Sequence, residues 1–120
     1  MAKSINRHFH FLGSSKKVQS GQLWYPAADV FQTPEGWLVK VELAGVSVED
    51  VEIDIQGNIL SIIGARKDRS CAVVGLSFHQ MEITYSRFEK TLKFPAVIEG
   101  ARIEHNFEDG ILIIRLWKAD

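Results

Sequence analysis

Apolar and polar residues alternate along short segments of this chain from Trp24 onward. In residues 37–43 and again in 51–56, every second residue is apolar, which is the period of a strand with one buried face. Further segments rich in β-branched and aromatic residues are predicted to be strands at 59–63, 88–94, 103–107 and 111–116. No window shows a convincing helical period, so the pattern predicts an all-β sandwich.

Turn residues mark the joins between these predicted strands. The sequence Thr-Pro-Glu-Gly at 33–36 supplies a proline that presets one turn dihedral and a glycine that tolerates the backbone conformation at the end of the turn. The pairs Gly57-Asn58 and Asp109-Gly110 each separate two apolar runs. Both residues of Gly57-Asn58 tolerate the positive φ that a two-residue hairpin requires, so this pair predicts a β-hairpin, and Asp109-Gly110 predicts a turn before the last strand.

Two parts of the chain depart from the strand pattern. Residues 1–23 mix polar and basic residues around Phe9, Phe11 and Leu12, and we expect a flexible N-terminal arm. Between residues 65 and 86, a polar stretch is followed by the apolar run 72–78, for which we expect a short strand inside a long loop. A long loop with its own strand is typically functional, and here we expect it to reach another molecule.

Composition limits the classes of function. A chain of 120 residues with 46% hydrophobic content suits one domain, which at this size buries about two thirds of the surface of its unfolded form. Its 14 basic and 15 acidic residues lack the basic excess of a nucleic-acid-binding protein. One cysteine excludes an internal disulfide, and no apolar run suits a signal peptide or a membrane span. We expect a soluble cytoplasmic protein that binds neither nucleic acid nor membranes.

Residue types that carry catalysis or bind metals form no recognisable motif in the sequence. Cys71 has no neighbouring motif of a nucleophile, and Glu52 and Asp54 share a predicted solvent-exposed face where carboxylates favour solubility. The chain has no glycine-rich phosphate loop. No acidic or cysteine residues cluster in the sequence with the histidines, which are His8, His10, His79 and His105. We therefore expect no enzyme activity, no cofactor and no metal site.

Five stretches of the chain match, in order, the motifs of one domain family. The stretch 24–30 resembles W-x-P-x-x-D-V, 41–46 resembles E-L-P-G-V, and 49–51 resembles E-D-I. Further on, 85–95 resembles Y-G-x-F-x-R-x-F-x-L-P and 105–112 resembles A-x-x-x-n-G-V-L. Each motif is weak alone, but their order and spacing across residues 24–118 are specific. Together they resemble the α-crystallin domain of small heat shock proteins, the Hsp20 family.

This resemblance implies a fold and a division of the chain. The implied fold is an immunoglobulin-like antiparallel β-sandwich, the α-crystallin domain, over residues 24–118, with a long loop that carries a dimer-exchange strand. The flexible arm 1–23 precedes it and a vestigial C-terminus, 119–120, comes after it. The chain departs from the family motifs at five positions, which are Ala44, Ser86, Lys90, His105 and Trp117. Lys90 replaces an arginine and loses its planar fork, so weaker ionic contacts across a dimer are expected.

The C-terminal end bears on the expected assembly. Members of the family usually carry a C-terminal extension with an I-x-I or I-x-V motif that links dimers into large shells. Here only Ala119 and Asp120 follow Lys118. We therefore predict a homodimer or small oligomer, and co-assembly with a longer relative that supplies the missing tail remains an open alternative.

The resemblance also implies where other proteins bind. It places a groove for extended segments between strands 51–55 and 103–107, and the predicted lining is Val51, Ile53, Ile55, Ile103 and His105. The plainer alternative is that these residues only face the core. A second predicted site for unfolding client proteins is the arm with Phe9, Phe11 and Leu12, and the alternative there is a tail without function.

Resemblance to bacterial members implies dimerisation by exchange of the loop strand. Residues 73–78 of one subunit would pair beside residues 29–31 of the other. The predicted dimer interface is Asp29, Val30, Phe31, Val73, Val74, Leu76, Phe78 and Lys90. The exchange would explain why a short apolar run lies inside a long polar loop.

The function implied by the resemblance is that of an ATP-independent molecular chaperone, a holdase that binds unfolding proteins and prevents their aggregation. Two alternatives stay open. One is a structural assembly protein, similar to spore-coat proteins that resemble this family, and the other is a partner-specific co-chaperone of the p23 type. The opening motif and the strand-bearing loop favour the small heat shock branch, because the p23 branch lacks the exchanged strand.

Overall fold

The computed structural model of the chain describes residues 23–69 and 74–118. These residues form eight strands and one short 3-10 helix. The elements are β1 (Leu23–Trp24), β2 (Ala28–Thr33), β3 (Gly36–Glu42), η1 (Val48–Asp50), β4 (Val51–Gln56), β5 (Ile59–Ala65), β6 (Arg87–Lys93), β7 (Arg102–Glu108) and β8 (Ile111–Trp117). The predictions for Phe9, Phe11, Leu12, Cys71 and Val73 lie outside the described residues.

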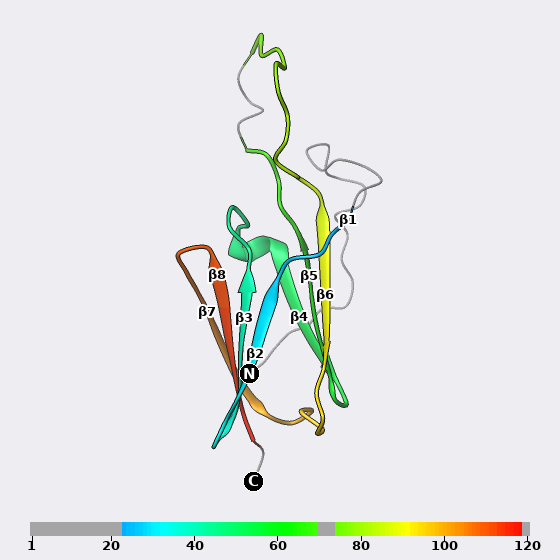
Figure 1. The fold of residues 1–120 in the computed structure, drawn as a ribbon, viewed down its shortest axis with the longest axis vertical. Helices are drawn as coiled ribbons and strands as arrows, with labels where there is room; N and C mark the ends of the chain where they lie inside the picture. The colour runs from blue at the N-terminus through cyan, green and yellow to red at the C-terminus, as the bar shows by residue number, and fades with distance from the viewer. Residues whose placement is uncertain (1–22, 70–73, 119–120) are drawn as a thin grey trace.

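The strands form two four-stranded sheets, with the orders β1-β6-β5-β4 and β2-β3-β8-β7. Figure 1 shows them running side by side along the long axis, with one loop projecting beyond the strands. Every pairing is antiparallel except that of β1 with β6, where Leu23 and Trp24 lie parallel to Arg87 and Phe88. The predicted all-β sandwich is confirmed, and β1 is an addition that the sequence pattern did not indicate.

The core lies between the sheets and matches the alternation of apolar residues. Cross-strand neighbours share a face, so Val39 on β3 and its partner Ile114 on β8 point inward together. The buried cluster contains Val39, Val41, Leu43, Leu60, Ile62, Phe88, Phe94, Ile98, Leu112, Ile114 and Leu116. Trp24 packs edge-on against Phe88 with ring centroids 5.6 Å apart, which ties the short β1 to the core.

The predicted hairpin at Gly57-Asn58 and the predicted turn at Asp109-Gly110 are both present, and each joins two antiparallel strands. Asp109 and Gly110 both have positive φ, 54° and 81°, as a type I′ turn requires. At the other turn Gly57 has a positive φ of 62°, whereas the φ of Asn58 is not positive. Asn58 contributes through its side chain, whose Nδ2 donates to the Phe94 carbonyl at 2.8 Å. Its role is therefore to tie the hairpin to the end of β6.

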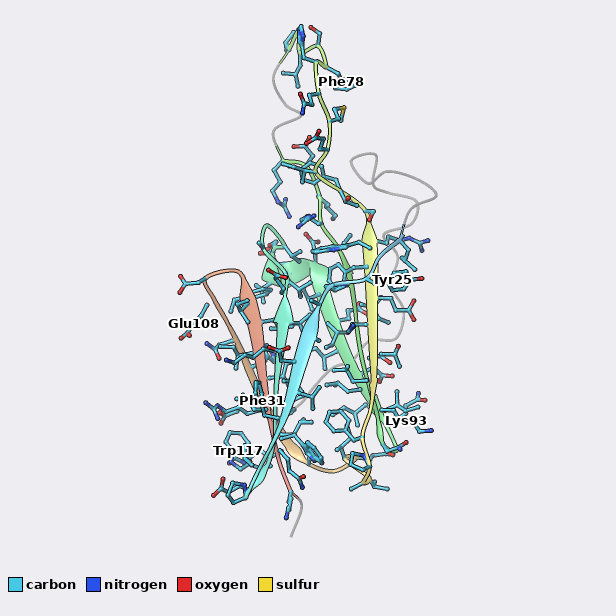
Figure 2. The ribbon with its side chains drawn as sticks, viewed as in Figure 1. Tyr25, Phe31, Phe78, Lys93, Glu108 and Trp117 are labelled. Atoms are coloured by element: carbon cyan, nitrogen blue, oxygen red, sulfur yellow. The ribbon has the colours of Figure 1, made fainter. Side chains whose placement is uncertain are left out.

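The long loop between β5 and β6 corrects one expectation. We predicted a strand at 73–78, but residues 74–86 contain no strand in the described part of the loop, and Val74–Gly75 form a turn. A strand requires a neighbour for its backbone hydrogen bonds. Figure 2 shows Phe78 near the end of the projecting loop, away from both sheets, so no described strand lies beside it there.

Candidate protein-binding surfaces

The sandwich has two open sides, because each sheet has two edge strands. β1 and β2 are edge strands of different sheets and are joined by only three residues, 25–27, so their edges share one side. The other two edge strands, β4 and β7, therefore share the opposite side. Within the described chain each of these edge strands pairs with a single neighbour, which leaves half of its backbone donors and acceptors directed outward.

On β4 the apolar residues face inward at the margin of the sandwich. Val51, Ile53 and Ile55 lie opposite Gly64, Ile62 and Leu60 of β5, which are buried. The three β4 side chains are themselves only partly buried, although they pack against the core. Part of each side chain therefore contacts the core, and the rest is accessible to another chain.

On β7 the inward-facing row is formed by Ile103, His105 and Phe107. Their cross-strand partners on β8 are Leu116, Ile114 and Leu112, all buried. Ile103 and Phe107 are partly buried against the core, whereas His105 is exposed. The β4–β7 rim is the name we give to the inward-facing row of both edge strands, namely Val51, Ile53, Ile55, Ile103, His105 and Phe107.

The structure thus places all five residues predicted to line the groove on one open side of the sandwich. Phe107 was missed by the prediction, although the alternation of Ile103, His105 and Phe107 already indicated a shared face. The plainer alternative also holds in part, because the apolar members of the rim pack against the core. Binding of another chain at the rim stays a prediction.

The predicted dimer interface divides into two separate surfaces in the single chain. On the edge strand β2, Val30 is 42% exposed and Phe31 is 45% exposed. On the loop, Val74 is 95% exposed and Phe78 is 71% exposed. Figure 2 shows Phe31 on the edge strand β2 and Phe78 near the far end of the loop, so these two side chains do not meet within one chain.

Lys90 occupies the inward face of β6, opposite the buried Ile62. Its side chain is half-buried, and no described residue forms a hydrogen bond or ion pair with its ammonium group. Lysine pays a desolvation cost in such a position unless a carboxylate or carbonyl approaches. Its predicted place in a subunit interface is consistent with that need and remains untested.

Metal ligands and membrane-spanning elements are not found in the described residues. Among them, no three histidine, cysteine or acidic side chains gather in a group able to hold a metal ion. His105 lies on β7 and His79 lies in the exposed loop. In the same part of the chain, no helix is both long enough and apolar enough to span a bilayer.

Comparison with known proteins gives a consistent family assignment. The profile of the Hsp20/alpha crystallin family matches residues 29–120. Small heat shock protein C2 from Rickettsia felis is 33% identical over 95 residues, which cover 79% of this chain and 61% of that protein. Spore protein SP21 from Stigmatella aurantiaca is 26% identical and is matched over 83% of this chain and 59% of that protein. The chain thus spans about three fifths of the length of these curated relatives.

The solved structures give the same result for the fold. Heat shock protein 16.0 from Schizosaccharomyces pombe superposes with a TM-score of 0.71 and 32% sequence identity. The match covers 81% of this chain and 89% of that one. Both sheets of the sandwich therefore have counterparts in a known protein of similar sequence.

Proposed function

This chain belongs to the Hsp20/alpha crystallin family, and from that premise we propose that it is an ATP-independent holdase in the cytoplasm. It captures partly unfolded client proteins on exposed apolar surface and keeps them from aggregating. The observation that carries the proposal is the β4–β7 rim, where apolar side chains lie partly exposed on two edge strands that each pair with one neighbouring strand among the described residues. The family resemblance seen in the sequence is confirmed, and it agrees with the expectation that the chain is not an enzyme.

An extended client segment can bind the rim by adding to an edge strand. Main-chain hydrogen bonds to β4 or β7 give affinity that does not depend on the client sequence. Alternate apolar side chains of the segment then pack against Ile53 or Ile103 and their neighbours. Segments of this kind are buried in folded proteins and become accessible on unfolding, so the rim distinguishes unfolding proteins from native ones.

Capture of this kind needs only reversible exposure of apolar surface. Burial stabilises by about 25 cal/mol per Å² of apolar area removed from water, and release occurs when the client refolds or another chaperone competes. The proposal includes a homodimer or small oligomer formed through the loop and the β2 edge. Binding of clients by Phe9, Phe11 and Leu12, and co-assembly with longer relatives, are further parts of it.

The test compares rim variants with a control on the outer face of the sheet that contains β4. Ile53→Thr combined with Ile103→Thr replaces two apolar rim side chains by smaller β-branched side chains that carry a hydroxyl. Ile63→Thr makes the same change at a half-buried position on β5 whose neighbours are Glu52 and Glu89, on the outer face. Light scattering of a heat-unfolding enzyme measures how much chaperone prevents aggregation.

We expect the double rim variant to require about three to ten times more protein for equal protection, since each apolar-to-polar exchange weakens binding by up to about 1 kcal/mol. The control should protect like the wild type, and thermal unfolding should show that all variants are folded. If the wild-type chain gives no protection at any ratio, the holdase proposal is wrong. If the rim and control variants protect equally, the rim is not the client site.

A structural assembly protein is the second candidate, and the similarity to Spore protein SP21 favours it. Such a protein would self-associate strongly and would protect few clients. Trials with several unrelated clients separate the two functions, because a holdase protects most of them. The Hsp20/alpha crystallin match supports the small heat shock branch over the p23-type alternative.

A further inference from the structure

The long loop is held where it leaves and rejoins the sandwich by Arg66, the first residue after β5. Arg66 Nε donates to the Thr84 carbonyl at 2.9 Å, and Nη1 donates to the Ala44 carbonyl at 3.0 Å. The guanidinium group stacks over the Trp24 ring, 3.9 Å from its centroid. One side chain thus connects the outgoing end of the loop, its returning end, β1 and the turn after β3.

Asp50, the last residue of η1, forms ion pairs with two residues that follow Arg66 at the start of the loop. Its Oδ1 lies 3.2 Å from Lys67 Nζ and its Oδ2 lies 2.8 Å from Arg69 Nη2. The Asp50 side chain is only 16% exposed, so its carboxylate is partly shielded from solvent, although Arg69 is largely exposed. We call Asp50, Arg66, Lys67 and Arg69 the root clamp.

Beyond the root clamp the described loop has no hydrogen bond to the sandwich. Between residues 74 and 83, Gln80 Nε2 donates a hydrogen bond to Glu82 Oε2, and this contact lies inside the loop itself. The same segment carries exposed apolar side chains, which are Val74, Leu76, Phe78, Met81 and Ile83. The direction of the loop is therefore set at its root.

We propose that Asp50 and Arg66 are positioning residues that aim the loop at a second copy of this chain. This inference rests on the proposed dimer. The root clamp orders residues 66–69 and the return at Thr84 in the single chain, before any partner is present. A loop whose root is already ordered loses less conformational entropy on docking, and its association is stronger for that reason.

The geometry favours a second copy as the partner. The loop projects away from the sheets, whereas the β2 edge of the same chain, with Val30 and Phe31, lies alongside them (Figure 2). The apolar loop residues and this exposed edge therefore do not cover each other within one chain. In a symmetric pair of chains, each loop covers the β2 edge of the other chain, so the same contact forms at two places in the dimer.

The test removes the charge of Asp50 and compares the result with a control carboxylate. Asp50→Asn keeps the size of the side chain but loses both ion pairs, and Asp50→Glu retains the charge. Glu89→Gln makes the equivalent neutralisation at an exposed position on β6. The dimer dissociation constant is measured by sedimentation over a dilution series, and the unfolding of the monomer is measured at concentrations below that constant.

We expect Asp50→Asn to raise the dimer dissociation constant about five- to tenfold, because its ion pairs are partly exposed and only partly shielded. Asp50→Glu should restore most of the affinity, and Glu89→Gln should stay within about twofold of wild type. Arg66→Lys should also weaken the dimer, since lysine cannot stack and donate to two carbonyls at once.

Two results for the Asp50→Asn variant would overturn the inference. One is an unchanged dissociation constant for Asp50→Asn. The other is a loss of monomer stability large enough to account for the whole change, which would make the root clamp purely structural. Failure of the proposed function looks different, because a wild-type chain that dimerises but never protects a client contradicts the holdase while leaving the root clamp intact. A wild-type chain that never dimerises overturns the root-clamp inference and the proposed dimer together.

Discussion

At the scale of single residues, Gly64 and His105 show how one side chain controls a strand edge. Gly64 is buried on β5 opposite Val51, and it lets the Asp50 carbonyl and the Phe88 ring approach the backbone closely. His105 stands where the rim is otherwise formed by apolar residues. Gly64 lets the neighbouring backbone and ring pack closely against β5, and His105 places a polar side chain in the otherwise apolar rim.

Gly64→Ala should destabilise the domain. A Cβ at this position would collide with the Asp50 carbonyl oxygen and would lie 2.6 Å from Phe88 Cζ, which is tighter than the packed core can accept. Overpacking of this kind costs about 1–3 kcal/mol, and we expect a value at the upper end because a backbone atom must move. Thermal and chemical unfolding measure the loss. Ser61→Ala, on the outer face of β5, should change stability by less than about 0.5 kcal/mol, and an equally stable Gly64→Ala would refute the packing argument.

His105→Val should strengthen the binding of extended apolar segments at the rim. The change replaces a polar ring by an apolar β-branched side chain between Ile103 and Phe107, and the added apolar contact favours binding by up to about 1 kcal/mol, or fivefold. Binding of a short apolar peptide, monitored by fluorescence anisotropy, measures the effect. Asn106→Val makes a comparable change on the outer face of β7 and should leave peptide affinity unaltered. Equal gains in both variants would show that the peptide binds nonspecifically.

At the scale of elements, the edge strands determine where this sandwich can associate. β2 pairs along its length with β3 and leaves its other edge open within the described chain. Its residues Val30 and Phe31 are exposed apolar side chains, and Lys40 covers part of Phe31 at 5.6 Å from the ring centroid. Open edges with apolar side chains promote pairing with other strands, so β2 is the element where dimerisation should be most easily blocked.

Val30→Lys should weaken the dimer with little effect on the fold. An inward-pointing lysine on an edge strand is a known obstacle to edge-to-edge pairing, and Val30 is exposed enough in the single chain for lysine to reach solvent. We expect the dimer dissociation constant to rise at least tenfold, or about 1.4 kcal/mol, by sedimentation. Thr91→Lys, on the outer face of β6, is the control and should dimerise normally. Normal dimerisation of both variants would exclude the β2 edge from the interface.

At the scale of the whole molecule, the projecting loop gives the chain an extended shape. The radius of gyration is 16.0 Å and the longest dimension is 57 Å, whereas a compact domain of this length would have a radius of about 13–14 Å. The excess reflects a segment that does not pack on its own sandwich, as Figure 1 shows. Apolar side chains on such a segment remain in water unless another molecule covers them.

We therefore predict that the wild-type chain is a dimer over a broad range of concentration. Light scattering across a dilution series should give twice the chain mass of 13.5 kDa, falling to a single mass at high dilution. The Val30→Lys variant should show the single mass at concentrations where the wild type is still paired. A large assembly that persists on dilution would show that another contact joins the dimers.

The sequence alone predicted six of the eight strands and the turns between them, because these depend on neighbours close in the chain. Alternation assigned Val39 and Ile53 to inward faces, and Gly57-Asn58 specified a hairpin through its own backbone preferences. Motif order identified the Hsp20/alpha crystallin family across most of the chain. Each of these inferences needed no knowledge of which sheets pack together.

The tertiary structure decided everything that depends on contacts between distant segments. Alternation shows that Ile53 and Phe107 face inward, but only the packing of two sheets makes them a half-buried rim rather than a closed core. The run at 74–78 forms no strand, because a strand needs a neighbouring strand and none of the described residues provides one there. Arg66 donates hydrogen bonds to the carbonyls of Ala44 and Thr84, which lie 22 and 18 residues away in sequence. No local sequence pattern predicts these contacts.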